Sequence, residues 1–324
     1  MPALGPPVEC VEGTPERLNK VVPIRNLLAF ELEDPSAEIS VIMVVYMTGP
    51  ALFTSIARVL ADPDVDDFVI VDNGSSETDQ ARLFAISQTD DRIRLLQGHG
   101  NIGFARGANL GASAARGRFL VFLNPDAFLE AGCVQALQDA TQGQPSPCIV
   151  GARVLNEDRT EQRGARRYEV TPITTLLSFT RLAEAIPSLR RFEIHLEDEP
   201  LPLHPAPVPV ISGACFGVSR ADFRRLKGFD GDFFLHVEDI DLCWRARGMG
   251  GIVLFHPTAE VVHLGHTSLV EPMFVEWFKG NGLAHYFVKR APDWPRRLLA
   301  YALGPLIVGA SVSRPLLRKL TGRS

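Results

Sequence analysis

The fold of this chain is decided by residues 119–126, FLVFLNPD. The apolar run Phe119 to Leu123 is typical of a short buried strand, and the turn Asn124-Pro125-Asp126 ends it. Proline cannot donate to a strand ladder and biases the preceding residue toward an extended conformation, so we expect Asp126 at the carboxyl tip of the strand. Open α/β sheets bind ligands at that edge, and a carboxylate there suits a divalent cation that bridges a diphosphate. The alternative for this motif alone is a strand-ending turn with a solvated aspartate.

The composition narrows the class of protein. With 324 residues and 46% hydrophobic content, the chain is long enough for one large α/β domain or two smaller ones. A net charge of −5 argues against a nucleic-acid partner. The five cysteines are scattered without a CxxC pair, which fits a reducing compartment and no zinc site. The N-terminus shows no basic region followed by an apolar run, so we expect a cytoplasmic protein without a secretory signal.

The region before residue 150 alternates between strand and helix patterns. Apolar, β-branched runs predict strands at residues 39–46, 68–71, 93–96 and 119–123. Apolar residues at helical spacing, at 52–60 and at 129–137, and an Ala-rich stretch after 101–111 predict helices between and after these strands. This rhythm predicts a doubly wound, mostly parallel central sheet.

The remainder of the chain divides into segments with and without a regular helix or strand pattern. Residues 1–37 are proline-rich and aperiodic, and we expect an irregular N-terminal arm. Between residues 151 and 210 the pattern loosens around a basic cluster and a proline-rich piece, which predicts an insertion or lid. A regular pattern of strands and helices resumes in residues 211–270. Residues 271–324 form a separate C-terminal segment that we expect to be helical.

The C-terminal segment contains an uncharged run from Leu298 to Ser313 with arginines and a lysine on both flanks. At 16 residues this run is shorter than the roughly 20 that a spanning helix needs, and Gly304-Pro305 is expected to interrupt it. We therefore predict a segment that lies on an anionic membrane surface, peripheral on the inner face of the plasma membrane. The alternative is a helical hairpin that packs on the domain or on a partner chain.

Three acidic sites stand out. Asp72 and Asp126 are expected at strand tips, and Glu238-Asp239-Ile240-Asp241 is expected to begin a helix. On that helix Glu238, Asp241 and Arg245 share one face, whereas Asp239 points elsewhere, because residues three and four apart are neighbours. A helix N-terminus stabilises an ionised carboxylate, as a general base requires at neutral pH. An isolated EDxD is more often ordinary acidic bias at a helix start.

Two further patterns are weaker when taken alone. His263 follows an apolar pair, and its imidazole could complete a metal site built from carboxylate and phosphate oxygens, although His266 is close by and a structural histidine is the commoner case. The run from Asn101 to Gly111 is not a GxGxxG dinucleotide fingerprint. Its glycines would allow close approach of a nucleotide or ribose, with Arg106 free to meet phosphate.

The ordered set of motifs is more specific than its members. It comprises VDNGSS (71–76), NIGFARGANLG (101–111), FLNPD (122–126), SGACFGVSR (212–220), GFDGDFFLHVEDIDLCWR (228–245) and VVHLGHTS (261–268). This set resembles the family 2 inverting glycosyltransferases with the GT-A fold, and most of all their rhamnosyltransferase-type members. The resemblance covers residues 38–270. It implies a nucleotide-sugar-binding half (38–150), an acceptor-side lid (151–210), and a half that carries the catalytic base (211–270).

The resemblance also implies roles for individual residues. Asp239 would be the catalytic base, supported by Glu238, Asp241 and Arg245. Mg²⁺ or Mn²⁺ would bind Asp126, in the place of the family's DxD signature, with His263. Asp72 would pair with a pyrimidine base and Arg106 would help to hold the nucleotide. The full nucleotide-sugar site would comprise Tyr46, Asp72, Asn73, Asn101, Gly103, Arg106, Asn109, Asn124, Asp126 and Gly213.

The chain departs from the family pattern at three positions. Met47 stands where many relatives have asparagine, His266 stands where a glycine is common, and Asn124 replaces the first acid of DxD. The lower charge at the metal is compatible with a deoxyribose nucleotide such as dTDP, and the expected donor is dTDP-linked or UDP-linked. The expected function is metal-dependent, inverting transfer of a sugar, with rhamnose from dTDP-rhamnose as one candidate, to a glycan or lipid-linked acceptor in cell-surface polysaccharide synthesis. A nucleotidyltransferase and a catalytically silent sugar-nucleotide-binding protein are the alternatives.

Overall fold

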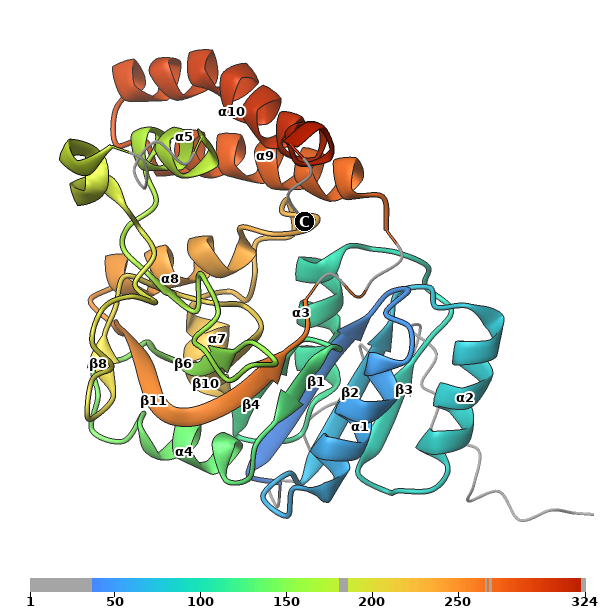
Figure 1. Cartoon of the computed structure of the whole chain (residues 1–324). Coiled ribbons are helices and arrows are strands. Elements are labelled where there is room, and N and C mark those ends of the chain that lie inside the picture. The colour runs from blue at the N-terminus through green and yellow to red at the C-terminus, as the bar shows by residue number, and fades with distance from the viewer. Residues whose placement is uncertain (1–36, 181–185, 266, 268–269, 322–324) are drawn as a thin grey trace, which may run out of the picture.

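The computed structural model describes residues 37–180, 186–265, 267 and 270–321. The predicted N-terminal arm, apart from Ala37, and His266 lie outside the described residues. A nine-stranded sheet forms the centre, with strand order β3-β2-β1-β4-β10-β6-β11-β5 and with β8 beside β11. Helices flank this sheet, and a pair of long C-terminal helices lies against one end of the unit (Figure 1).

The first part of the sheet confirms the predicted parallel arrangement. Strands β1 to β4 are mutually parallel, with β1 at the centre between β2 and β4. Every residue of β1, β2 and β4 is buried, as expected for parallel strands covered on both faces. The elements are β1 (Ile39–Val45), α1 (Ala51–Ala61), β2 (Asp67–Asp72), α2 (Glu77–Ser87), β3 (Ile93–Leu96), α3 (Phe104–Ala114) and β4 (Phe119–Leu123).

The second part of the sheet is mixed. Strand β10 is antiparallel to both β4 and β6, β11 is parallel to β6, and β5 and β8 are antiparallel to β11. The short strand β5 begins directly after Asp126, and its register pairs Ala127 with His263. The elements are β5 (Ala127–Leu129), α4 (Cys133–Asp139), β6 (Cys148–Leu155), β8 (Ala206–Pro207), β10 (Cys215–Ser219), α7 (Arg220–Arg225), α8 (Glu238–Gly248) and β11 (Ile252–His263).

Some predicted elements differ in extent. Leu129 belongs to β5 rather than to the following helix, because β5 pairs with a distant strand that sequence periodicity does not reveal. Strand β11 is one continuous strand over 252–263 with a register shift between His256 and Glu260. Strand β6 crosses the predicted boundary between residues 150 and 151, so the segment that leaves the sheet begins after Leu155.

The predicted insertion forms a small layer of its own. Strand β7 (Arg166–Arg167) pairs antiparallel with β9 (Val210–Ile211), and this pair sits beside the main sheet. A helix, α5 (Pro172–Thr180), and a 3-10 helix (Pro187–Phe192) lie between these two strands in the chain. Helix α5 packs against the C-terminal helices, so the insertion connects the sheet unit with the end of the chain (Figure 1).

The C-terminal segment is a helical hairpin. Helices α9 (Pro272–Arg290) and α10 (Trp294–Thr321) pack along each other, and a Cβ at Gly280 would lie 2.9 Å from Cα of Val308. The predicted interruption at Gly304-Pro305 is wrong, because α10 continues through it. Proline removes one backbone hydrogen bond, and packing of α10 along α9, where a Cβ at Gly304 would lie 3.5 Å from Cβ of Ala284, favours a continuous helix here.

A cluster of phenylalanines fixes the loop that precedes α8. The ring of Phe122 on β4 lies 5.0 Å from that of Phe216 on β10 and 5.1 Å from that of Phe229. Phe229 also contacts Phe223 of α7, with a centroid distance of 5.6 Å. Aromatic packing of this kind anchors residues 228–235 on the sheet and so sets the start of α8.

Candidate active site

The turn after β4 presents Asp126 at the carboxyl edge of the sheet, as predicted. Its carboxylate is buried, and it accepts a hydrogen bond of 2.9 Å from the hydroxyl of Thr267 through Oδ2. Its other oxygen, Oδ1, lies 3.1 Å from Nε2 of His263. The β5–β11 register accounts for this proximity, because it places the last residue of β11 beside the residue that follows Asp126.

The imidazole of His263 is oriented by Gln162. Nδ1 of His263 lies 2.7 Å from the amide oxygen of Gln162, while the amide nitrogen of Gln162 donates to the backbone carbonyl of His263 at 3.0 Å. Because that carbonyl can only accept, the amide orientation is fixed and Nδ1 must carry the proton. In its neutral form His263 would then direct the lone pair of Nε2 toward Asp126, and in its protonated form it donates from Nε2 to that carboxylate. A carboxylate oxygen and an imidazole lone pair that converge in this way fit a divalent cation.

The surroundings of Asp126 favour its ionised form. Burial raises the pKa of this carboxyl group, but hydrogen bonds from His263 and Thr267, with the charge of His263, outweigh burial and lower its pKa below the ordinary value. An ionised carboxylate is the form that a metal ligand requires.

Asp239 lies in the first turn of α8 and faces the insertion. Its Oδ2 accepts hydrogen bonds from Nη2 of Arg167 at 2.8 Å and from the backbone N–H of Gly213 at 3.1 Å. Directly before α8, His236 and Val237 both have positive φ, at 66° and 77°. Such a conformation is uncommon for any residue except glycine and strained for a β-branched one, and strain of this kind accumulates at functional sites.

Two consecutive residues of the chain, Gly213 and Ala214, contact Asp239 and the turn that carries Asp126. The backbone N–H of Asn124 donates to the carbonyl of Ala214 at 2.8 Å, and the N–H of the preceding Gly213 donates to Asp239. A Cβ at Gly213 would lie 3.3 Å from Cβ of Asp239, so glycine allows this close approach. The two acids, 113 positions apart in sequence, therefore flank one short backbone segment.

The residues predicted to support Asp239 are buried around the base of α8. Asp241 is fully buried and binds Nε of Arg245 and Nζ of Lys289, each at 2.7 Å. Arg245 also donates to the carbonyl oxygens of Leu226 and Gly228, so this pair ties α8 to α9 and to the preceding loop. Burial, followed by repulsion from Asp239, raises the pKa of Glu238 to about 8.

Asp72 and Asn73 lie at the tip of β2 and are buried. Oδ1 of Asp72 accepts hydrogen bonds from the N–H groups of Gly74 and Ser75, and Oδ2 accepts from Gln97 at 3.0 Å. Asn73 donates to the carbonyl of Gly103 at 3.0 Å and faces His99. These contacts hold the β2 tip against the turn into α3.

That turn is fixed by Asn101 and Gly103. Oδ1 of Asn101 accepts a 3.0 Å hydrogen bond from the N–H of Gly103, which has φ of +83°. A Cβ at Gly103 would approach the carbonyl oxygen of Phe234 to 2.8 Å, so only glycine fits without a shift. The turn into α3 and the loop before α8 are thus in direct contact.

Three other residues predicted to contact the nucleotide, Tyr46, Arg106 and Asn109, have different neighbours in the structure. Tyr46 lies over Gly74, whose Cβ position is 3.6 Å from its ring. Arg106 is exposed and donates from Nε to the carbonyl of Gly231 at 2.9 Å. Asn109 holds the loop before α8, since its amide donates to and accepts from the backbone of Phe229, at 2.8 and 2.9 Å.

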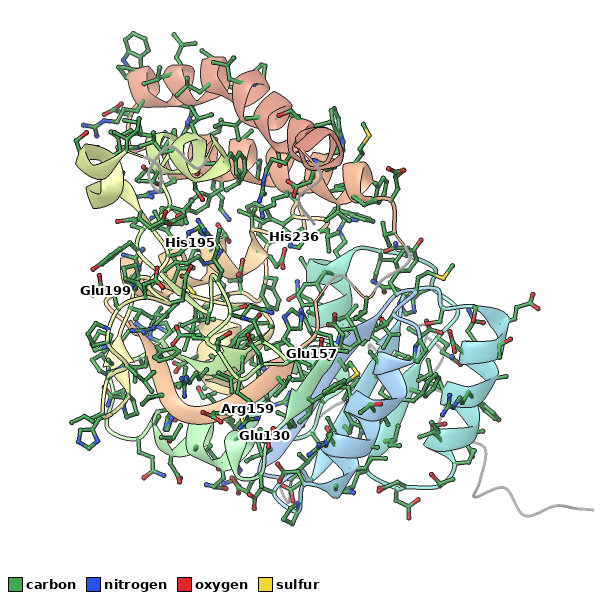
Figure 2. The ribbon with its side chains drawn as sticks, in the orientation of Figure 1. Glu130, Glu157, Arg159, His195, Glu199 and His236 are labelled. Atoms are coloured by element: carbon green, nitrogen blue, oxygen red, sulfur yellow. The ribbon has the colours of Figure 1, made fainter. Side chains whose placement is uncertain are left out.

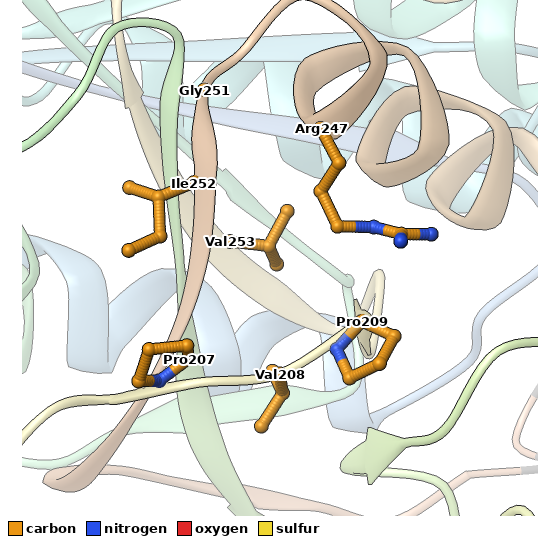
Figure 3. Close-up of a pocket in the computed structure, with 7 residues that line it drawn as sticks. All are labelled: Pro207, Val208, Pro209, Arg247, Gly251, Ile252 and Val253. Atoms are coloured by element: carbon orange, nitrogen blue, oxygen red, sulfur yellow. The ribbon is translucent and has the colours of Figure 1, made fainter.

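Two features lie apart from this edge of the sheet. Asp230, Asp232 and His285 bring possible ligand atoms within 4.8 Å of one another, but Lys289 already pairs with Asp230 at 2.6 Å. A pocket of about 240 Å³ is lined by Pro207, Val208, Pro209, Arg247, Gly251, Ile252 and Val253 (Figure 3). It lies at the first residues of β11, whereas His263 is the last, so it is not part of the candidate site.

The family model "Glycosyl transferase family 2" matches residues 40–226. The chain belongs to this family. It is a glycosyltransferase, and its mixed α/β sheet with C-terminal helices is the GT-A arrangement. The match ends before α8, so it includes Asp72 and Asp126 but not Asp239.

Curated relatives are similar over much of the chain. The N-acetylglucosaminyl-diphospho-decaprenol L-rhamnosyltransferase of Mycobacterium tuberculosis is 27% identical over 303 residues, which cover 86% of this chain and 96% of the relative. The low-salt glycan biosynthesis hexosyltransferase Agl10 of Haloferax volcanii is 26% identical over 214 residues, covering 65% of this chain and 62% of the relative.

Solved structures show the same fold. The mannosyltransferase PcManGT from Pyrobaculum calidifontis, in complex with GDP-Man and Mn²⁺, has a TM-score of 0.52 at 15% identity and covers 91% of this chain and 80% of its own. GalNAc-T7 with UDP, GalNAc and Mn²⁺ has a TM-score of 0.56 at 15% identity and covers 77% of this chain. This chain spans about half of GalNAc-T7, at 47% of its length.

Several residues at the site were not predicted as site residues. Arg167 belongs to a basic cluster, Thr267 lies in the motif VVHLGHTS without an assigned role, and Gln162 carries no signal in the sequence. Their contacts with Asp239, His263 and Asp126 depend on how the insertion and the end of β11 fold back onto the sheet. The basic cluster was the hint that could have pointed to Arg167, because it lies in a segment whose sequence shows little helix or strand pattern.

Proposed function

We propose that this glycosyltransferase transfers a sugar, with inversion, from a nucleotide-diphosphate donor to a hydroxyl of a lipid-linked glycan. The observation that carries the proposal is that one backbone segment, Gly213-Ala214, contacts Asp239 directly and, through the N–H of Asn124, the turn that carries Asp126. A displacement reaction needs such proximity, because one group must stabilise the leaving diphosphate while another accepts the proton of the attacking hydroxyl at the same anomeric carbon. The rhamnosyltransferase relative supports rhamnose, with dTDP-rhamnose as the donor we would try first.

The proposed role of each residue follows from the chemistry of its side chain. Asp72, at the tip of β2, would hold the pyrimidine base, and the turn from Asn101 to Gly103 would border the ribose. Asp239 would accept the proton of the acceptor hydroxyl as that hydroxyl attacks the anomeric carbon from the face opposite the diphosphate. Because one attack displaces the nucleoside diphosphate, no covalent intermediate is needed and the configuration inverts.

Asp126 and His263 are the residues that would hold Mg²⁺ or Mn²⁺. The orientation of His263 by Gln162 supports this assignment. A bound divalent cation would supply Lewis-acid compensation of the charge that develops on the leaving diphosphate. The Mn²⁺ in the PcManGT and GalNAc-T7 structures makes Mn²⁺ the first ion to test.

The decisive assay presents the purified chain with dTDP-linked and UDP-linked sugars, Mn²⁺ or Mg²⁺, and a synthetic lipid-linked GlcNAc acceptor. We expect metal-dependent transfer with release of a nucleoside diphosphate and formation of the inverted linkage. Release of pyrophosphate from a nucleoside triphosphate would instead identify a nucleotidyltransferase. Donor binding without transfer and without slow donor hydrolysis would identify a silent sugar-nucleotide-binding protein.

We propose that helix α10 attaches the enzyme to an anionic membrane surface. Among the described residues, the stretch Trp294–Pro315 is long and apolar enough to cross a membrane by length and composition, and 22% of it is buried. One face packs on α9 and α5, which also agrees with the hairpin alternative. The other face exposes large apolar side chains beside exposed Arg296, a combination that suits an interface. These side chains are Trp294, Leu298, Leu299, Tyr301 and Leu306.

Charge reversal on this face is expected to release the enzyme from vesicles. For the double variant Leu298→Glu and Tyr301→Glu we expect at least about tenfold weaker flotation with phosphatidylglycerol vesicles, because apolar burial is lost and each carboxylate is repelled. Phe84→Glu is a matched control, since Phe84 is exposed on α2. Equal flotation of the double variant and the control, with both folded, would show that α10 is not the attachment surface.

A further inference from the structure

Helix α9 brings Lys279 to the start of α8. Gly282, one turn further along α9, lies against residues 236–237, and its Cβ position is 3.2 Å from Cγ2 of Val237 and 3.3 Å from the carbonyl oxygen of His236. Residues three apart share a helix face, so Lys279 faces the same turn. The ring of neighbouring Phe278 stacks on Phe234 with centroids 4.5 Å apart, which fixes this end of α9.

The carboxylates near Lys279 are already engaged. Asp239 is bound by Arg167 at 2.8 Å, and Glu276 accepts from Ser311 at 2.7 Å and pairs with Arg314 at 3.3 Å. Within the part of the chain that the structure describes, neither carboxylate pairs with Lys279. Figure 2 places His236, in the turn before α8, between the C-terminal helices and the sheet unit.

Two cations, Arg167 and Arg314, act on Lys279. The carboxylates that would offset them, Asp239 and Glu276, are each already paired with one of these arginines. Burial, followed by the charge of Arg314, lowers the pKa of Lys279 to about 8. A partly buried ammonium group beside other cations is a site that an anion would stabilise, because the anion supplies the missing charge and hydrogen-bond acceptors.

We propose that Lys279, with Arg167 beside it, binds a phosphate or diphosphate carried by the acceptor's own reacting sugar. This inference rests on the proposed function, because it takes Asp239 as the group that receives the acceptor proton. When a hydroxyl of the acceptor sugar points at Asp239, the phosphate on the anomeric carbon of that sugar would lie about one sugar ring away, toward α9. The acceptor's lipid chain would then continue along the α9–α10 hairpin toward its exposed apolar face.

The site is tested first by binding, without catalysis. Geranyl diphosphate is titrated into the full-length protein in the presence of EDTA, so that metal at Asp126 cannot hold the diphosphate. We expect Lys279→Met to weaken binding about 10- to 100-fold, as loss of a charge-assisted contact does, and Lys279→Arg to retain it. Lys227→Met is the control, since Lys227 is exposed at the end of α7. Absence of binding to the unaltered protein, or equal binding by Lys279→Met, would overturn the inference.

A kinetic comparison then separates this site from the proposed function. With GlcNAc-diphosphate-geranyl as acceptor, Lys279→Met should raise KM about 10- to 100-fold with kcat little changed, while KM for an uncharged alkyl GlcNAc glycoside stays as in the parent enzyme. An equal rise of KM for both acceptors would refute a phosphate contact. Diphosphate binding that depends on Lys279 in a protein without transferase activity would keep the site and reject the proposed function.

Discussion

Replacement of Asp239 by asparagine is expected to abolish sugar transfer while leaving donor binding intact. Asparagine has the same shape, and its amide oxygen can still accept from Arg167 and from the N–H of Gly213. It loses only the hydrogen bond from the N–H of Ile240 to Oδ1, so the start of α8 should keep its position. An amide cannot accept a proton from the attacking hydroxyl at neutral pH. Loss of a general base costs typically about 10²- to 10⁴-fold in rate, and we expect kcat to fall within that range.

The measurement compares kcat for transfer with donor affinity from calorimetry on the same preparation. Asp232→Asn is the matched control, because Asp232 is an exposed carboxylate in the loop just before α8. Turnover of Asp239→Asn near that of the parent enzyme would remove Asp239 from this role. A similar loss in Asp232→Asn would direct attention to the group formed by Asp230, Asp232 and His285.

The parallel half of the fold could be predicted because its signal is local. A parallel strand covered on both faces is a continuous apolar run, and the polar turn that ends it marks the carboxyl edge of the sheet. For this reason the predicted bounds of β3 and β4 agree with the structure, and Asp72 and Asp126 lie at strand ends.

The other half depends on pairings that no local pattern contains. Strand β5 has three residues, too few to show a period, yet its register with β11 brings His263 to Asp126 from 137 positions away. The contact of Arg167 with Asp239 likewise requires the two-residue pairing of β7 with β9. The contacts of Asn109 with the backbone of Phe229, 120 positions away, also have no local signal in the sequence.

The sequence could not decide how the C-terminal segment folds either. Gly304-Pro305 reads locally as a helix break, and the break does not occur because α9 packs along this stretch. Long-range packing can thus override a strong local signal. It also places Lys279 and the exposed face of α10 on one hairpin, so the proposed phosphate and membrane contacts of the acceptor would come from a single structural unit.

Replacement of Asp126 by alanine is expected to remove metal-dependent donor binding. The variant loses one of two proposed ligands and leaves His263 and Thr267 without their carboxylate partner. Calorimetry with the donor should give the same weak affinity with Mn²⁺ as with EDTA, whereas the parent enzyme should bind more tightly with Mn²⁺.

Two further variants make this test specific to the proposed metal site. Asp158→Ala removes an exposed turn carboxylate and should leave Mn²⁺ dependence unchanged. Gln162→Leu keeps both proposed ligands but frees the tautomer of His263, so Mn²⁺ affinity should fall about 10- to 100-fold, as it does when a residue that orients a ligand is lost. Mn²⁺ binding, read by electron paramagnetic resonance of the free ion, reports on this step without catalysis. If Asp126→Ala retained full Mn²⁺ affinity while folded, the cation would have to bind elsewhere, and the Asp126–His263 pair would be an ordinary ion pair that holds β5 to β11.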